Sequence, residues 1–374
     1  MKVDWIVVGA GFTGATLAER IATQLGQRVL VVERRDHIGG NAYDEYDEHG
    51  VLVHRYGPHV LRTNDVRVWS YLSQFTTWRP YYHRVLAVVD GIKVPIPFNL
   101  NSLDKLFPPH YARRLSSLLI AEYGFGGEVS IVNLLNSPKL ELRKFAQFVY
   151  ERVFYGYTKK QWGIEPESLD PEVLGRVPIR VSRDDRYFKA KYQAIPAEGY
   201  TMLIRRMLRH RNIRVLLGVD YRELGHEVCA KGVVFTGPID EFFDYVHGPL
   251  PYRSLHFEFV NIPEERFQEV ATVNYPNDFD FTRVTEPKHI TGQCHPHTVL
   301  IYEYPKPYEP GLNEPYYPIP QPENYRLYEL YRKEAAELGK YVIFAGRLGE
   351  YNYCSMDQAV ARALTLFEEV ITRI

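Results

Sequence analysis

Three glycines near the N-terminus have the spacing that lets a backbone approach a phosphate. Gly9, Gly11 and Gly14 form the pattern G-x-G-x-x-G directly after the apolar run 3–8. The first glycine permits a tight turn, the second lets a pyrophosphate approach, and the third lets a helix pack on the strand. Free N–H groups and the helix dipole then face the phosphates. The pattern predicts a dinucleotide site; the alternative is a turn needed only for packing.

An acidic residue follows at the position where such a site binds a ribose. Glu33 lies nineteen residues after Gly14 and ends the apolar run 28–33, so its carboxylate is placed to accept hydrogen bonds from an adenosine ribose. A second glycine pair stands in the run Gly39-Gly40-Asn41, which suggests close backbone approach to a larger ligand. The run 33–42 resembles the FAD-binding type of Rossmann fold that flavin amine oxidases share, and we therefore expect FAD.

The helices and strands that must position these residues are predicted from hydrophobic periodicity and from the glycines and prolines that interrupt it. The last predicted strand and helix resemble the first unit in kind, so we expect a discontinuous dinucleotide domain with other domains inserted. The expected strands are 3–8, 28–33, short runs within 213–236 and 253–304, and 341–346; the expected helices follow the glycines and cover 65–75, 103–160, 325–338 and 356–373; 163–178 and 305–322 are expected to be loops.

Composition restricts the class of protein. The chain has 374 residues, 45% of them hydrophobic and 24% charged, with a formal net charge of −1. That balance argues against a general affinity for nucleic acid or acidic membranes. The three cysteines lie far apart without a C-x-x-C pattern, so we expect neither disulfides nor a metal site, and Cys294-His295-Pro296-His297 is expected to be incidental. We expect a cytoplasmic protein without a stable membrane insertion.

A more specific signal runs through the middle of the chain. The run Gly156-Tyr157-Thr158-Lys159-Lys160-Gln161-Trp162-Gly163 resembles the signature of UDP-galactopyranose mutases. Further runs resemble the same family in order and with compatible spacing, namely 56–59, 176–180, 185–188, 237–240, 252–255, 282–286, 314–318 and 346–349. The resemblance extends from residue 3 to about 370.

The resemblance implies an α/β fold, α+β overall, in which a discontinuous Rossmann-type FAD-binding domain carries an inserted helical bundle and an antiparallel β-sheet domain. The expected segments are 1–76, 191–245 and 323–374 for the FAD-binding domain, 77–190 for a mainly helical substrate domain with a mobile loop at 163–178, and 246–322 for the sheet domain.

The resemblance also assigns site residues. Arg176 and Arg283 would neutralise the substrate diphosphate, since guanidinium forks match phosphate oxygens; ordinary solvated arginines are the alternative. Substrate contacts are expected from Phe154, Tyr157, Trp162, Tyr187, Asn274, Tyr304, Tyr353, Arg62 and His83, of which the aromatic residues could instead serve the core. Cofactor contacts are expected from Gly9, Gly11, Phe12, Thr13, Gly14, Glu33, Arg34, Gly39, Gly40, Asn41, His59, Val219, Arg347 and Met356; a surface salt bridge is the alternative for Arg347.

The activity implied is the interconversion of the pyranose and furanose forms of a UDP-sugar, an isomerase reaction without net redox change. In this family, N5 of the reduced flavin attacks the anomeric carbon and UDP departs and returns. The resemblance further implies an external reductant such as NAD(P)H, a homodimer, and the supply of galactofuranose for cell surface polysaccharide.

Three positions depart from the family pattern. Arg62 stands where a histidine is usual, and its donors match the acetamido carbonyl of UDP-N-acetylgalactosamine, which is the alternative substrate beside or in place of UDP-galactose. His83 stands where an asparagine is common, and Ser355 where an aspartate is usual. Two other functions stay open: an FAD-dependent oxidoreductase of the amine-oxidase type, and a nucleotide-sugar-binding protein without turnover.

Overall fold

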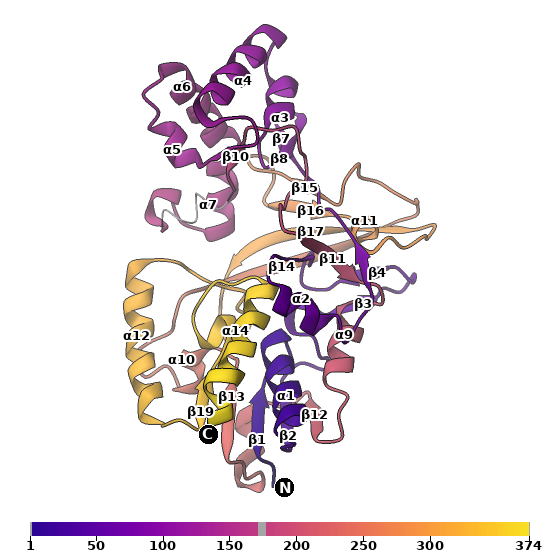
Figure 1. Ribbon diagram of the computed structural model, residues 1–374, viewed down its shortest axis with the longest axis vertical. Coiled ribbons are helices and arrows are strands. Elements are labelled where there is room, and N and C mark those ends of the chain that lie inside the picture. Colours follow the sequence, from indigo (N-terminus) through magenta and orange to yellow (C-terminus); the bar gives the residue numbers. More distant parts are fainter. Residues whose placement is uncertain (1, 171–176, 374) are drawn as a thin grey trace. The chain divides into compact units, whose positions relative to one another are not determined.

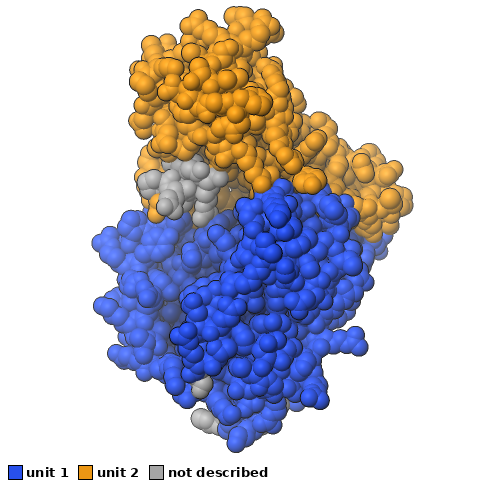
Figure 2. Space-filling view, in the orientation of Figure 1, with its two compact units in different colours: residues 1–81, 190–253, 308–374 blue, residues 82–189, 254–307 orange. Residues whose placement is uncertain are grey.

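The computed structural model describes residues 2–170 and 177–373, and its elements fall into two compact units. Unit 1 comprises residues 1–81, 190–253 and 308–374, and unit 2 comprises residues 82–189 and 254–307 (Figure 2). Each unit is therefore built from segments that are far apart in the sequence. Within the described ranges, no helix combines the length and the apolar character needed to cross a bilayer.

Unit 1 is built on a parallel sheet with the strand order β12-β2-β1-β13-β19 (Figure 1). Its strands are β1 (Trp5–Val8), β2 (Val29–Glu33), β12 (Ile213–Leu217), β13 (Gly232–Phe235) and β19 (Val342–Phe344). β1 and β2 are almost wholly buried, as expected for a parallel strand covered on both faces. The expected strand at 3–8 begins two residues later, at Trp5.

Two helices that are distant in sequence pack together on this sheet. α1 (Phe12–Gln24) and α14 (Met356–Glu369) share one core cluster with β1 and β2, through apolar residues such as Leu17, Ile21 and Val360. α1 ends where Gly26 adopts a φ of +66°, the left-handed conformation that favours glycine after a helix. The discontinuous dinucleotide domain expected from the sequence is thereby formed from both ends of the chain.

Smaller elements complete unit 1. A second sheet has the order β5-β11-β6, and β3 pairs with β4 as a hairpin. Their bounds, with those of the remaining unit 1 elements, are η1 (Gly40–Ala42), β3 (Asp44–Tyr46), β4 (Leu52–His54), β5 (Leu61–Thr63), α2 (Val66–Leu72), β6 (Trp78–Pro80), β11 (Tyr192–Pro196), α9 (Tyr200–Met207), η4 (Tyr221–Glu227), α10 (Ile239–Phe242), β18 (Tyr317–Pro318), α12 (Pro322–Glu337), α13 (Gly346–Gly349) and η5 (Ile371–Arg373).

Unit 2 combines a helical cluster with the strands β14-β17-β16-β15-β7-β8 of a sheet whose full order is β18-β14-β17-β16-β15-β7-β8. β18 pairs with Tyr252 and Arg253, the two residues of β14 that belong to unit 1. The sheet strands are β7 (Val85–Val89), β8 (Ile92–Ile96), β14 (Tyr252–Ile262, which begins in unit 1), β15 (Thr272–Asn274), β16 (Arg283–Thr285) and β17 (Thr298–Pro307). The other elements are α3 (Leu100–Leu106), α4 (Pro109–Tyr123), β9 (Glu128–Val129), α5 (Ile131–Leu135), α6 (Leu140–Val149), the π-helix η2 (Tyr150–Tyr155), α7 (Gly156–Trp162), η3 (Pro166–Ser168), β10 (Ile179–Arg180) and α11 (Pro287–Thr291).

The sequence analysis did not identify the hairpin formed by β7 and β8. Its turn is Asp90-Gly91, and both residues have positive φ, +48° and +80°, as a two-residue hairpin turn requires. Val85, Ala87 and Val89 are buried in one core cluster with Phe98 and Phe145. The hairpin is therefore part of the core of unit 2.

Candidate active site

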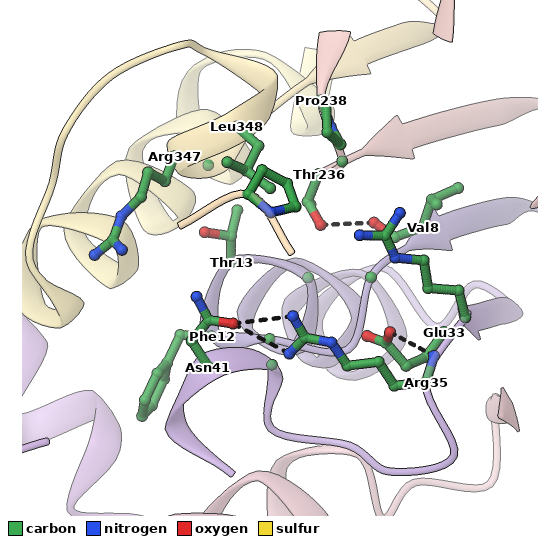
Figure 3. Close-up of a pocket in the computed structure, with 18 of the residues that line it drawn as sticks. Val8, Phe12, Thr13, Glu33, Arg35, Asn41, Thr236, Pro238, Arg347 and Leu348 are labelled. Atoms are coloured by element: carbon green, nitrogen blue, oxygen red, sulfur yellow. Dashed lines mark hydrogen bonds between the residues drawn. The ribbon is translucent and has the colours of Figure 1, made fainter. Parts of the chain in front are cut away.

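A cavity of about 370 Å³ lies in unit 1, at the carboxyl ends of the parallel strands β1, β2 and β13 and at the start of α1 (Figure 3). Ligands of open α/β sheets bind at this edge. The structure brings all of the expected cofactor residues together as lining of this cavity: Gly9, Gly11, Phe12, Thr13, Gly14, Glu33, Arg34, Gly39, Gly40, Asn41, His59, Val219, Arg347 and Met356.

Close packing against neighbouring residues explains two of the glycines. Gly9 has a φ of +100°, and a Cβ atom there would lie 2.1 Å from Oγ1 of Thr236, a hydroxyl that donates to the Val8 carbonyl oxygen at 2.7 Å. A Cβ atom on Gly40 would lie 2.9 Å from Cα of Gly11. Two glycine-containing turns thus face each other with no room for side chains, as a backbone cradle for a pyrophosphate requires.

Glu33 joins the glycine turn to the end of β2. The carboxylate is 7% exposed; its Oε2 accepts from the Ala10 amide at 2.8 Å and its Oε1 from the Arg35 amide at 3.0 Å. A carboxylate has about four acceptor positions, so these two bonds leave capacity for ribose hydroxyls. The arrangement fits the adenosine end of FAD, and the ribose contact itself stays a prediction.

The sequence analysis missed an ion-pair cluster in the cavity wall. Arg34 and Arg35 each donate through Nη2 to Oε2 of Glu314 at 2.8 Å, and Arg35 also donates to Oδ1 of Asn41 at 3.1 Å. Burial raises the pKa of Glu314, but the charges of Arg35 and Arg34 outweigh burial and leave the pKa below its ordinary value. The two arginines and Glu314 belong to separate runs that resemble the family, about 280 residues apart in the sequence. No spacing within one segment could therefore have predicted that they form ion pairs.

Arg347 is held by carbonyl groups at the start of α13. Its Nη1 donates to the Tyr316 carbonyl at 3.1 Å and its Nη2 to the Cys354 carbonyl at 2.7 Å. The guanidinium lies 5.2 Å from the ring centroid of Tyr317 and 5.5 Å from that of Tyr353. In the part of the chain that is described, no carboxylate forms an ion pair with Arg347, so the surface salt bridge considered as its alternative is not seen.

A second polar cluster forms within unit 2, where strand register aligns three side chains. Asn274 on β15 is opposite Arg283 on β16, which is opposite Glu303 on β17. Arg283 donates to Oε2 of Glu303 through Nε at 2.8 Å and Nη2 at 2.6 Å. Glu303 is only 2% exposed. Its Oε1 and the Oδ1 of Asn274 are buried and lack a hydrogen-bond partner among the described residues.

His83 and Tyr187 belong to the same neighbourhood as Arg283. Burial, with a contribution from the charge of Arg283, lowers the pKa of His83 to about 3, so its imidazole is neutral at physiological pH. The His83 and Tyr187 rings lie 5.8 Å apart, and the Tyr187 amide donates to the His83 carbonyl at 2.7 Å. A cationic, a neutral and a phenolic side chain are thereby grouped in unit 2.

The expected substrate-binding aromatics Phe154, Tyr157 and Trp162 lie on the adjoining helices η2 and α7. Phe154 and Trp162 are 9% and 6% exposed, and Phe154 belongs to the core of unit 2. Lys160, on α7 with Tyr157, donates through Nζ to the carbonyls of Tyr275, Asp278, Phe279 and Phe281. This ammonium group fastens α7 to the loop that directly follows Asn274.

The remaining expected residues are distributed as follows. Tyr304, on β17, donates its hydroxyl to Glu258 at 3.1 Å. Tyr353 is in unit 1 and is 36% exposed. Arg62 is on β5 opposite Gln193 and is not part of the cavity lining. Arg176 lies outside the described residues.

Comparison with known proteins gives concordant results along the whole chain. A sequence model described as UDP-galactopyranose mutase matches residues 152–353, and one for NAD(P)-binding Rossmann-like domains matches residues 7–75. A probable UDP-galactopyranose mutase of Klebsiella pneumoniae is 38% identical, with 99% of this chain and 95% of the relative covered. A dTDP-fucopyranose mutase of Escherichia coli is 34% identical, with 96% of each chain covered.

The fold is also found among solved structures. A crystal structure of reduced UDP-galactopyranose mutase matches with a TM-score of 0.76 at 18% identity, covering 100% of this chain and 96% of that one. Fold and cavity together define a dinucleotide-type flavoprotein, with FAD as the cofactor that fits. The chain belongs to the UDP-galactopyranose mutase family and is thus an isomerase; this membership favours the mutase over the amine-oxidase alternative.

Proposed function

We propose that the protein interconverts the pyranose and furanose forms of UDP-galactose, with FAD in its reduced state. The observation that carries this proposal is the row Asn274–Arg283–Glu303 in unit 2, in which an oriented guanidinium lies among buried polar groups. The other unit of the same chain holds the FAD-type cavity. Reduced FAD supplies a nucleophilic nitrogen for the anomeric carbon of the sugar.

The task of the protein in this reaction is to hold the leaving group. As the bond between the anomeric carbon and the diphosphate breaks, negative charge grows on the diphosphate, and a fixed guanidinium stabilises that charge. Glu303 holds Nε and Nη2 of Arg283, which fixes the plane of the fork. We assign the same task to Arg176, with hydroxyl donors from Tyr187, Tyr304 and Tyr353. UDP held in this way is retained until the bond re-forms.

We further assign the uracil to Tyr157 and Trp162, with Phe154 and Asn274 beside it. The fastening of α7 by Lys160 supports this assignment, because the aromatics and Asn274 are then part of one rigid substructure. The fourteen expected cofactor residues, all of which are among those that line the unit 1 cavity, are assigned to FAD, with Glu33 at the ribose and Arg347 at the pyrophosphate.

The choice of sugar is a separate question, because the relatives include a dTDP-fucopyranose mutase as well as UDP-galactopyranose mutases. UDP-N-acetylgalactosamine is the second candidate substrate, since Arg62 offers donors for an acetamido carbonyl. Incubating dithionite-reduced protein with UDP-galactose, UDP-N-acetylgalactosamine and dTDP-fucose, and separating the products chromatographically, tests the proposal. Equal isomerisation by oxidised and reduced protein would refute it.

Three further assignments rest on family resemblance: a homodimer, reduction by NAD(P)H, and the supply of galactofuranose for cell surface polysaccharide. A cytoplasmic location is also a proposal, and it rests on the composition of the sequence. We also retain as a proposal the functional division of the chain into the segments 1–76, 77–190, 191–245, 246–322 and 323–374. This division differs in its bounds from the two compact units described above. Light scattering and anaerobic titration of the flavin with NADPH test the dimer and the reductant.

A further inference from the structure

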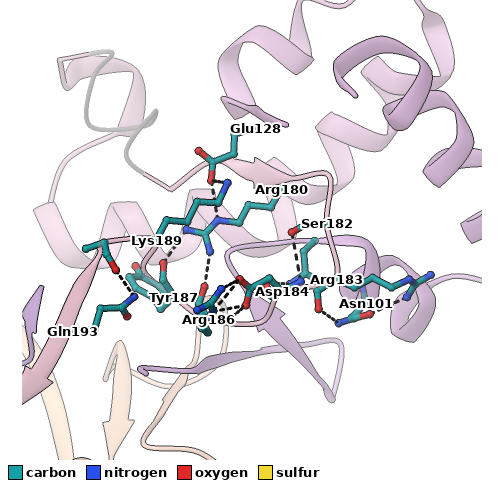
Figure 4. Close-up of polar contacts among 12 residues, drawn as sticks. Asn101, Glu128, Arg180, Ser182, Arg183, Asp184, Arg186, Tyr187, Lys189 and Gln193 are labelled. Carbon is teal, nitrogen blue, oxygen red and sulfur yellow. Dashed lines mark hydrogen bonds and ion pairs between the residues drawn. The ribbon is translucent and has the colours of Figure 1, made fainter. Parts of the chain in front are cut away.

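Arg180 is a buried arginine to which no role has been given so far. It is 5% exposed and lies on β10, where its backbone is paired with Glu128 on β9. Its Nε donates to Oε1 of Glu128 at 2.9 Å, and Lys189 reaches the same oxygen at 2.8 Å (Figure 4). A buried guanidinium requires such a counter-charge, and Glu128 therefore accounts for one edge of Arg180.

The other edge of Arg180 does not contact an acid. Its Nη1 donates to the carbonyl of Arg186, and its Nη2 donates to the carbonyl of Tyr187 at 3.0 Å (Figure 4). Two consecutive backbone carbonyls are thus bound by one planar fork. Lysine has no such fork, since its three donors radiate from a single atom. This contact specifies arginine for geometric reasons as well as for its charge.

The backbone of Tyr187 is fixed on its other side too. Its amide donates to the His83 carbonyl at 2.7 Å, and the neighbouring Arg186 forms an antiparallel bridge with Arg84. The carbonyl and the amide of Tyr187 are therefore both held, by Arg180 and His83 respectively. With both groups held, the position from which the phenol projects is set. His83 in turn lies within the electrostatic influence of Arg283.

We infer that Arg180 is a positioning residue that sets the Tyr187 hydroxyl for binding the diphosphate of a nucleotide. The inference rests on the proposed function, in which Tyr187 donates to that diphosphate. Arg180 itself acts through the two backbone carbonyls and contacts no ligand. The ligand class is a nucleoside diphosphate, with or without the sugar.

A double-mutant cycle with UDP as the probe tests this inference, since coupling within the cycle separates positioning from general stability. UDP binding to the FAD-loaded protein is measured by calorimetry for the unchanged protein, Arg180→Lys, Tyr187→Phe and the double variant. We expect Arg180→Lys and Tyr187→Phe each to weaken UDP binding about tenfold, the loss of roughly one charge-assisted hydrogen bond. The double variant should bind about as weakly as Tyr187→Phe alone.

The matched control is Arg183→Lys. Arg183 is three residues further along the same segment and is also ion-paired, with Asp104 at 2.7 Å, but its side chain is 54% exposed. We expect Arg183→Lys to leave UDP binding unchanged. If Arg180→Lys has no effect, or weakens UDP binding by the same factor when Tyr187 is phenylalanine, the inference is wrong. If the unchanged protein does not bind UDP, the proposed function fails instead.

A second variant covers the case in which Arg180→Lys does not fold. Glu128→Gln retains both carbonyl contacts of Arg180 and removes the negative charge that Nε of Arg180 shares with Lys189. We expect it to weaken UDP binding less than Arg180→Lys, and only while the Tyr187 hydroxyl is present. A Glu128→Gln effect of equal size in the Tyr187→Phe background would overturn the inference.

Discussion

Two of the donors of Arg283 are committed to a single buried oxygen of Glu303. Replacement by lysine keeps the charge but loses the fork, so the ammonium cannot contact Glu303 in this geometry and bind a phosphate edge as well. We predict that Arg283→Lys lowers kcat/KM for the UDP-sugar by about 10- to 100-fold, the usual scale for one charge-assisted contact. Steady-state kinetics of the reduced enzyme measure this.

Arg152→Lys is the matched control for that variant. Arg152 is also in unit 2, pairs with Asp90 at 3.2 Å and is 51% exposed, and an exposed pair of this kind contributes little. We expect unchanged kinetics for Arg152→Lys. Equal losses in both variants would mean that Arg283 has no special role at the diphosphate.

Arg62 allows a prediction about substrate choice. If its guanidinium satisfies an acetamido carbonyl, a shorter imidazole at this position loses that contact. Arg62→His should then lower the ratio of kcat/KM for UDP-N-acetylgalactosamine to that for UDP-galactose, by about tenfold for one hydrogen bond to a charged group. Competition between the two sugars in one reaction measures the ratio directly. A ratio that does not change removes Arg62 from the question of specificity.

His83 gives the protein a pH dependence with a definite sign. Burial lowers its pKa to about 3, whereas the unfolded value is 6.5, so between these values the unfolded chain binds more protons. The free energy of unfolding should therefore fall as pH drops below 6.5, by about 1.4 kcal/mol per pH unit from this residue. His83→Asn should reduce the slope by nearly that amount in urea titrations between pH 6 and 4, a window that lies between the two pKa values. An identical slope in both proteins would contradict the buried, neutral imidazole.

Among the elements, α7 and the loop 275–281 are held together by Lys160, whose Nζ donates to four carbonyls of that loop. We predict that Lys160→Met destabilises the protein by about 1–3 kcal/mol, because carbonyl groups lose their donor. Lys159→Met is the control: Lys159 is the next residue on α7, is 49% exposed and pairs with Glu165 at 2.6 Å. Thermal melts of both variants with bound FAD measure the difference. Equal melting temperatures would show that the contacts of Lys160 with the loop 275–281 contribute nothing to stability.

Some of the helices and strands could be predicted from the sequence and others could not. The first strand–helix–strand unit follows from local signals, namely apolar runs, three glycines and Glu33, and the structure confirms it. The hairpin β7–β8 was missed because the sequence analysis assigned no element between residues 76 and 102, although Asp90-Gly91 between two apolar runs is a hairpin signal. The contacts of Glu303, Glu314 and Lys160 join residues 20 to 280 positions apart, and no spacing within a segment encodes such pairs. The resemblance to family motifs was enough to predict which residues line the cavity. The hydrogen-bond partners of these residues became known only from the folded structure.

At the scale of the whole molecule, the proposed ligands belong to different units. Every residue that lines the FAD-type cavity is in unit 1, whereas Asn274, Arg283 and Tyr187 are in unit 2. A ligand stabilises the structure that binds it, by about 2.7 kcal/mol at a hundredfold excess over its Kd. We predict that FAD added to the apoprotein slows amide hydrogen exchange in the segments 9–14 and 39–42 of unit 1. UDP added afterwards should slow exchange chiefly in 83–87, 186–187 and 272–283 of unit 2.

Hydrogen-exchange mass spectrometry of the apoprotein, the FAD form and the FAD–UDP form separates these effects, because local opening is reported segment by segment. The matched comparison is Arg283→Lys loaded with FAD: protection of unit 1 by FAD should persist, while protection of unit 2 by UDP should diminish. If UDP instead protected the glycine turns of unit 1 in the absence of FAD, the cavity would be a nucleotide-sugar site. The assignment of the diphosphate to Arg283 would then have to be abandoned.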